Sequence, residues 1–270
     1  MKQCKLKRLS AFFIGEMEQA MAYRGAFFTS FLADVVATLV KLFVWIAVFQ
    51  HRSTVAGFTY PMMITYLLIS QTINNIYAFK NDASRTISTK IRKGTIVFDL
   101  LRPVDFVNAR LSENLGQTLL QVIFSFCMLG VFSLFFPELS GPASAGHFCL
   151  FVISLVLSYI IMLSVCLLSG LLSFWLMNNW GIRNIRMALV SFLSGALVPI
   201  SMLPGWMRVI LEYLPFKGII YTPTMIYMGQ YGGNEMLLQL CLQLFWAAFM
   251  WIGTRMLFAR AVKRVTVNGG

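Results

Sequence analysis

Apolar residues dominate six stretches of this chain, and shorter polar segments separate them. A helix needs about 20 predominantly apolar residues to cross the hydrocarbon core of a bilayer. The expected spans are residues 27–49, 60–79, 115–136, 148–177, 187–202 and 236–258. The fifth stretch is shorter than the others, and the fourth is long enough to tilt or to extend beyond the bilayer. The pattern predicts an all-α integral membrane protein with six transmembrane helices.

Positive charge lies in alternate gaps between these stretches. With both termini inside, 18 of the 22 Lys and Arg residues fall on the cytosolic side, 3 fall outside, and Lys41 lies within the first span. This bias is the positive-inside pattern of membrane proteins, and it predicts cytosolic N and C termini. Anionic lipid headgroups are then the natural partners of the net charge of +12, and nucleic acid is not expected as a partner.

Residues 1–25 precede the first span and carry a different pattern. Apolar residues recur there at helical spacing, namely Leu6, Leu9, Phe13, Met17 and Ala20. A basic amphipathic helix of this kind lies in the membrane surface rather than crossing it. The alternatives are a frayed basic tail and a signal peptide, but the apolar stretch before Glu16 is short for a signal peptide. We expect residues 26–270 to form a single six-span domain.

Two of the expected spans carry polar side chains that lipid disfavours. Asp34 and Lys41 lie in the first span, separated by nearly two turns and therefore on one face, about 10 Å apart along the axis. The second half of the second span contains Gln71, Asn74 and Asn75. Such groups face protein or a water-filled cavity. We expect these five residues to line a translocation pathway or a subunit contact; the alternative is that the two charges snorkel or find structural partners.

Two further segments break the simple alternation of spans and loops. Residues 80–110 mix seven cations with regularly placed apolar residues, which indicates one or two short helices packed at the membrane face. Residues 203–233 are too apolar for a solvated loop and contain three prolines, so they cannot form one continuous span. We expect one or two short helices that re-enter the outer leaflet, since irregular backbone at that depth must be covered by protein or water.

Catalytic and metal-binding signatures are missing from the sequence. It contains no GxxxxGK[ST] phosphate loop and no GxSxG or HExxH motif. The five cysteines include no CxxC pair and most lie in or beside apolar runs, so we expect no disulfide and no metal site. We therefore expect no catalytic residues and no cofactor in this chain.

The arrangement resembles the membrane subunit of type-two ABC exporters over nearly the whole chain. Two pieces carry the resemblance on the cytosolic side, Ile91-Arg92-Lys93-Gly94-Thr95-Ile96 and Leu100-Leu101-Arg102-Pro103-Val104. A weaker piece includes Pro199, Met202, Leu203, Pro204, Trp206, Leu214-Pro215-Phe216, Pro223 and Gly229. The first two correspond to the family's cytosolic coupling helix, and the third resembles its re-entrant extracellular segment. The missing phosphate loop agrees with a permease whose ATPase is a separate chain.

The resemblance implies roles for named residues. The expected ATPase-coupling residues are Ile87, Ile91, Arg92, Lys93, Gly94, Leu100, Leu101, Arg102 and Pro103. An apolar stripe of Ile87, Ile91, Ile96 and Leu100 is expected to dock in a groove of the ATPase, with the cations as a rim and Gly94 in a tight turn. The alternative is that these cations only follow the positive-inside rule. Pro204, Trp206, Pro215 and Phe216 are the expected extracellular gate.

The resemblance also implies partners. Two permeases, as a homodimer or with a sister permease, would assemble with two ATPase copies that bind ATP and magnesium, in a bacterial inner membrane. The expected function is export by alternating access, and apolar walls with scattered amides suit drugs, peptides or lipids as cargo. The rival interpretations are an ATPase-independent secondary transporter or channel, for which inverted repeats are missing, and a lipid-modifying membrane enzyme, for which a catalytic constellation is missing.

Overall fold

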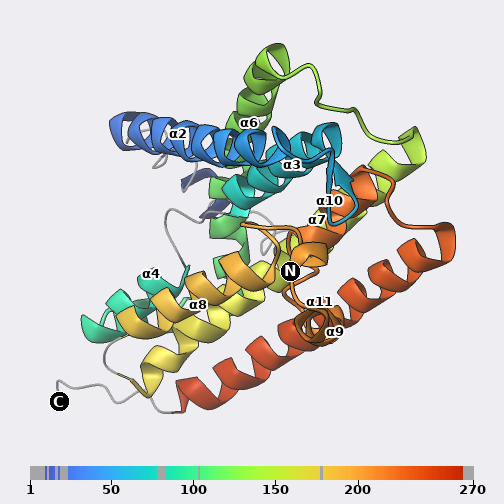
Figure 1. The fold of residues 1–270 in the computed structure, drawn as a ribbon. Coiled ribbons are helices and arrows are strands. Elements are labelled where there is room, and N and C mark those ends of the chain that lie inside the picture. The colour runs from blue at the N-terminus through green and yellow to red at the C-terminus, as the bar shows by residue number, and fades with distance from the viewer. Residues whose placement is uncertain are drawn as a thin grey trace.

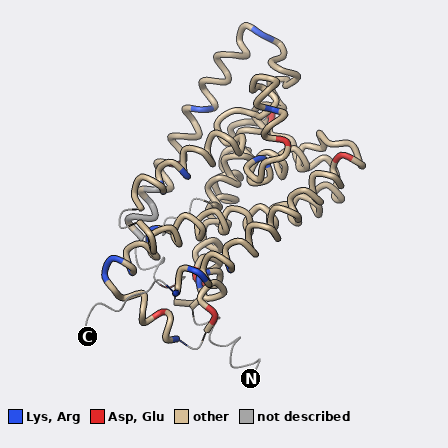
Figure 2. The backbone as a smooth tube through the Cα atoms, turned by 90° about the horizontal axis from the view of Figure 1, so that it is seen from below, with Lys and Arg blue, Asp and Glu red and all other residues tan. Residues whose placement is uncertain are grey.

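In the part of the chain that it describes, the computed structural model shows helices and a short β-hairpin (Figure 1). It describes residues 10, 12–15, 18, 24–77, 83–102, 104–176 and 179–263. Within these residues, four helical segments are long and apolar enough to cross a membrane: Phe31–Phe49, Phe106–Phe135, Ala145–Phe174 and Gly233–Val262. Long stretches of these helices carry no charge (Figure 2). The prediction of an all-α membrane protein is confirmed.

The four long segments belong to helices close to the expected spans. They are α2 (Arg24–Phe49), α6 (Phe106–Phe135), α7 (Ala145–Leu171, continued by the 3-10 turn η1, Leu172–Phe174) and α11 (Gly233–Val262). The largest difference is at α6, which begins nine residues before the expected span at 115. Asp105 caps this helix, because its carboxylate accepts a hydrogen bond of 2.9 Å from the Asn108 amide.

Helix α3 (Tyr60–Tyr77) occupies the second expected span and lies among the other helices, packed against α2, α6 and α7. Most of its side chains are buried, the polar Gln71 and Asn75 included. Helix α3 is less apolar than the four long helices and is not counted among them. Its polar side chains are tolerated because they meet protein rather than lipid. A hairpin of β1 (Thr54–Val55) and β2 (Phe58–Thr59) joins α2 to α3.

The fifth expected span differs from the structure. Helix α8 runs from Trp180 to Leu193, so Arg183 and Arg186, which fall between the fourth and fifth expected spans, are helical. The helix stops because Gly195 adopts a φ of 83°, a left-handed conformation that ends helices. The expected bounds 187–202 are therefore wrong, and the 14 residues of α8 are too few for an ordinary span. The six-span count stays a prediction.

The 203–233 segment contains two short helices, α9 (Gly205–Tyr213) and α10 (Tyr221–Tyr227), after the 3-10 turn η2 (Ile200–Met202). Every residue of α10 is buried, and this helix packs against α7 and α3. The chain is anchored where α8 ends, since the Tyr66 hydroxyl donates to the Gly195 carbonyl at 2.7 Å. Two short helices were expected here; their entry into the outer leaflet stays a prediction.

Most of the expected amphipathic helix, including Leu6, Leu9, Met17 and Ala20, lies outside the described residues. Two of its aromatic residues are placed. The guanidinium of Arg102 lies 5.3 Å from the centre of the Phe12 ring. The backbone of Phe13 approaches α6 so closely at Gly116 that a Cβ there would collide with the Phe13 carbonyl. This part of the N-terminal region therefore packs on the protein at the start of α6.

Candidate functional site

The segment between α3 and α6 folds into two short helices joined by a tight turn. They are α4 (Ala83–Arg92) and α5 (Ile96–Leu100). Gly94 occupies the turn with a φ of 69°, a conformation that side chains disfavour, and its amide donates to the Ile91 carbonyl at 3.0 Å. The sequence prediction of short helices around a glycine turn is confirmed. Pro103 lies outside the described residues.

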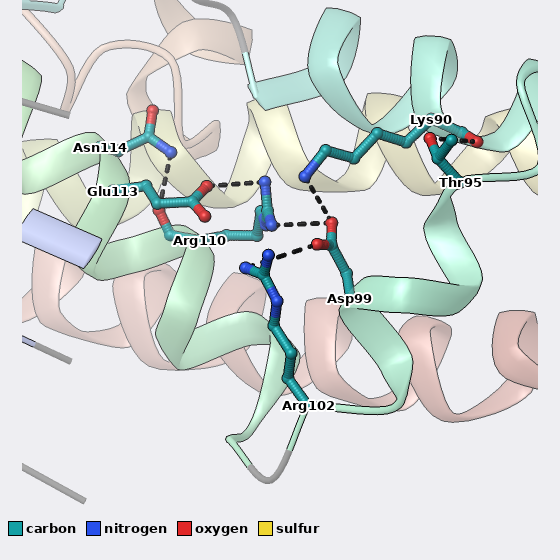
Figure 3. A network of polar contacts seen from close by, with 7 residues as sticks. All are labelled: Lys90, Thr95, Asp99, Arg102, Arg110, Glu113 and Asn114. Atoms are coloured by element: carbon teal, nitrogen blue, oxygen red, sulfur yellow. Dashed lines mark hydrogen bonds and ion pairs between the residues drawn. The ribbon is translucent and has the colours of Figure 1, made fainter. Parts of the chain in front are cut away.

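A buried ion cluster fastens α5 to its neighbours (Figure 3). The Asp99 carboxylate is 2.9 Å from the Arg110 guanidinium and 2.6 Å from the Lys90 ammonium, and Arg102 lies 3.7 Å from its other oxygen. Arg110 also pairs with Glu113 at 2.6 Å. The side chains of Asp99 and Arg110 are only 5% and 3% exposed, so this pair is shielded from solvent. The cluster ties α4 and α5 to the first turns of α6.

Helix α4 is fastened separately to α7. A Cβ at Gly170 of α7 would lie 2.8 Å from the Cα of Ser84, so the glycine permits a close approach of the two helices. The Ser84 hydroxyl also accepts a hydrogen bond of 2.8 Å from the Asn179 amide. Between them, the Asp99 cluster and the Gly170 contact join the α4–α5 unit to two long helices, α6 and α7.

The apolar side chains that remain exposed on this unit differ from the expected stripe. Ile87 and Ile96 are buried at 0% and 3% exposure, so the expectation that they face a partner is wrong. Ile87 instead packs against α7 beside Gly170. Phe98 and Leu101 are 68% and 75% exposed. Ile91 and Leu100 are partly buried, whereas Arg92, Lys93 and Arg102 are exposed, as the expected rim requires.

Three of the five polar residues expected along the translocation pathway, Lys41, Gln71 and Asn75, form a chain of contacts that reaches across α2, α3 and α6. The Lys41 ammonium of α2 donates to the side-chain oxygen Oε1 of Gln71 at 2.7 Å, and Nε2 of Gln71 donates to Oδ1 of Asn75 at 2.8 Å. Asn75 in turn lies 3.5 Å from the sulfur of Met128 on α6. Asp34, the other charged residue of α2, borders a small crevice together with Asn75. Both charged residues of α2 therefore lie beside α3. Asn74 is partly buried and is not a member of this chain.

The crevice beside Asp34 also borders on α6, through Gln121 and Ser125. Its volume is about 10 Å³, close to the minimum that holds one water molecule. In this conformation the crevice is therefore no open channel, although it brings polar groups of α2, α3 and α6 together.

The expected gate residues do not form one cluster. Pro204 and Trp206 are exposed at the start of α9, whereas Pro215, which is buried, and Phe216 follow its end. The nine residues of α9 separate the pairs by about 13 Å along the helix axis.

A second polar network, which the sequence analysis missed, joins this segment to α11. The buried Lys217 ammonium is 2.5 Å from the Glu212 carboxylate, which also accepts from Gln239 at 2.6 Å. Gln243 donates to the Gly218 carbonyl at 2.6 Å. The spacing of Gln239 and Gln243, four residues apart and hence on one helix face, is a sequence signal that could have revealed this contact.

Within the described residues, no group of three or more His, Cys, Asp or Glu side chains could hold a metal ion. The arrangement combines an exposed apolar tip on the α4–α5 unit with polar contacts between α2, α3 and α6. A sequence model of the family described as ABC-2 family transporter protein matches residues 35–269. No curated protein matches the chain.

Proposed function

The chain belongs to the ABC-2 family of transporter proteins, and from this premise we propose that it is the permease subunit of an ATP-driven exporter whose ATPase is a separate chain. Two permeases, identical or paired with a sister permease, assemble with two ATPase copies, which bind ATP and magnesium. The complex resides in a bacterial cytoplasmic membrane with both permease termini inside. Each permease supplies half of the translocation pathway.

The exposed apolar tip of the α4–α5 unit is the observation that supports ATPase coupling most strongly. Phe98 and Leu101 are 68% and 75% exposed, and the exposed cations Arg92, Lys93 and Arg102 lie in the same segment. A few side chains that fill well-packed, desolvated pockets carry most of the binding energy of a typical interface, and two adjacent exposed apolar side chains are suited to fill such a pocket. A charged rim adds orientation and a faster encounter with the partner.

The attachments of this unit indicate how motion would reach the spans. When the ATPase closes on ATP, a force on Phe98 and Leu101 passes through the Asp99–Arg110 pair into α6. A parallel route passes from α4 into α7 at the close contact beside Gly170. Tightly packed elements of this kind move as units rather than deforming. The polar chain Lys41–Gln71–Asn75 lies between α2, α3 and α6, where a shift of α6 would open or close a path for amphipathic cargo.

Replacing Leu101 with aspartate tests the docking proposal. We expect Leu101→Asp, alone and combined with Phe98→Asp, to abolish co-purification of the ATPase and ATP-dependent export, with unchanged permease abundance. Thr95→Asp is the matched control, because Thr95 is an exposed residue at the opposite end of α5 and gains the same charge without loss of an apolar anchor. Export without any bound ATPase would instead favour a secondary transporter or channel.

A further inference from the structure

An open cavity of about 440 Å³ lies between α4 and α8, which run side by side (Figure 1). Its walls include Arg85, Ser88, Thr89 and Arg92 of α4, and Trp180 and Arg183 of α8. The four α4 residues occupy positions i, i+3, i+4 and i+7, which lie on one face of a helix. The cavity is therefore built by two helices that meet along polar faces, and Arg92 belongs both to its wall and to the cations of the α4–α5 unit.

The chemistry of the walls fits a phosphoryl group. Three arginines converge on the cavity, and none of the described residues that line it is acidic. Arginine forks bind phosphate oxygens bidentately, and the hydroxyls of Ser88 and Thr89 can add further donors. The first turn of α8, which carries Trp180 and Arg183, presents backbone N–H groups that favour an anion.

A buried amide at the cavity points to a second feature of the ligand. Asn179 is only 4% exposed, and its Nδ2 donates to the Ser84 hydroxyl at 2.8 Å. Within the described residues, no donor reaches its buried Oδ1. A buried acceptor without a partner is energetically unfavourable, so a ligand that donates a hydrogen bond here relieves that cost. The site thus suits a phosphate attached to a group with a hydroxyl.

We propose that this cavity binds the headgroup of an anionic phospholipid that carries a hydroxyl, as phosphatidylglycerol does. The cavity can hold more than a bare phosphate, because its 440 Å³ compares with about 10–15 Å³ for the space that one water molecule needs. Trp180 at the cavity is 65% exposed, and Trp175 and Leu176, which follow the end of α7, are 39% and 47% exposed. Exposed tryptophans and apolar side chains at the end of a membrane helix are typical of the lipid interface, where acyl chains can lie.

Lipid retention by the purified protein in detergent tests this assignment. The site variant combines Arg85→Gln, Arg92→Gln and Arg183→Gln. The matched control removes the same number of cations outside the cavity, with Arg208→Gln, Arg260→Gln and Lys263→Gln. Both proteins are incubated with phosphatidylglycerol or phosphatidylcholine, and native mass spectrometry counts the bound lipids. In a further set of samples, inorganic phosphate is added as a competitor. If the triple variant misfolds, the single variants Arg85→Glu and Arg92→Glu, both at exposed positions, replace it.

We expect phosphatidylglycerol to be retained by the wild type and the control, and its affinity to fall on the order of tenfold or more in the site variant. Phosphatidylcholine should bind equally weakly to all three proteins. Equal retention of phosphatidylglycerol by site variant and control overturns the proposal. If millimolar inorganic phosphate displaces phosphatidylglycerol, the proposal that the ligand is a lipid is overturned, and a soluble phosphate compound is the ligand instead. Normal lipid binding together with loss of the ATPase assigns the cavity to a protein partner and also overturns it.

Discussion

Replacing Asp99 with asparagine tests whether the α4–α5 unit is rigidly fastened to α6. The substitution keeps the size of the side chain and removes its charge. Arg110, whose side chain is 3% exposed, then keeps Glu113 as its anionic partner in the cluster but loses the more deeply buried pair with Asp99. We expect the helices to remain folded, while α5 separates from α6 far more often.

The expected change in the free energy of opening α5 depends on which of the Asp99 ion pairs is shielded from solvent. Lys90 and Arg102 are 31% and 49% exposed, so their pairs with Asp99 contribute little, about 0–1 kcal/mol each. The Asp99–Arg110 pair is almost fully buried, and breaking such a pair by removing one partner typically costs about 3–5 kcal/mol. Local opening of α5 should become more frequent by about two to three and a half orders of magnitude, since 1.4 kcal/mol corresponds to a factor of ten.

Amide hydrogen exchange of residues 96–102, followed by mass spectrometry on the purified protein, measures this opening. The control is Asp105→Asn: the Asp105 and Arg255 side chains are 45% and 44% exposed and lie 3.8 Å apart, and asparagine keeps the cap of α6. We expect less than about tenfold faster exchange in the control. Exchange in Asp99→Asn within tenfold of the wild type, or equal acceleration in both variants, would refute the reasoning.

Three further substitutions test separate contacts. Gly170→Ala should push α4 away from α7, because its Cβ would meet the Ser84 backbone; it should lower the thermal unfolding midpoint, whereas Gly130→Ala, where a Cβ meets nothing, should not. Gly94→Pro should uncouple ATP hydrolysis from export, since proline cannot adopt a φ of 69° and lacks the donor to Ile91; intact coupling in a transport assay would contradict this. Lys41→Leu should reduce export and protein yield, because it leaves the side-chain oxygen of Gln71 without its donor. Adding Gln71→Leu should restore the yield but not export. Normal export by Lys41→Leu would show that the contact is structural.

Much of the fold was accessible from the sequence because lipid imposes simple rules. Apolar length located α2, α6, α7 and α11, since a bilayer admits helices of limited composition and length. The polar half of the second span correctly indicated that Gln71 and Asn75 meet protein, because both are 5% exposed in α3. The end of α8 was missed, since an apolar run does not reveal that Gly195 turns the chain back.

The candidate site was only partly predictable, for a physical reason. Helical spacing identifies which face of α4 is apolar, but it does not say whether the same chain or a partner covers that face. Ile87 is covered by α7, whereas Leu101 is left exposed. The pairing of Lys41 with Gln71, like that of Asp99 with Arg110, depends on how neighbouring helices are placed against each other. Tertiary packing sets that placement, and no local pattern in the sequence encodes it.

Photo-cross-linking from the tip of the α4–α5 unit tests the central claim most directly. Benzoylphenylalanine is introduced in place of Leu101, or in place of Leu134, which is 82% exposed near the C-terminal end of α6, in cells that contain the whole transporter. We predict that position 101 cross-links to the ATPase subunit and position 134 does not. A cross-link to the ATPase from position 134 with none from position 101 would contradict the account, because the power stroke would then enter at the other end of the molecule.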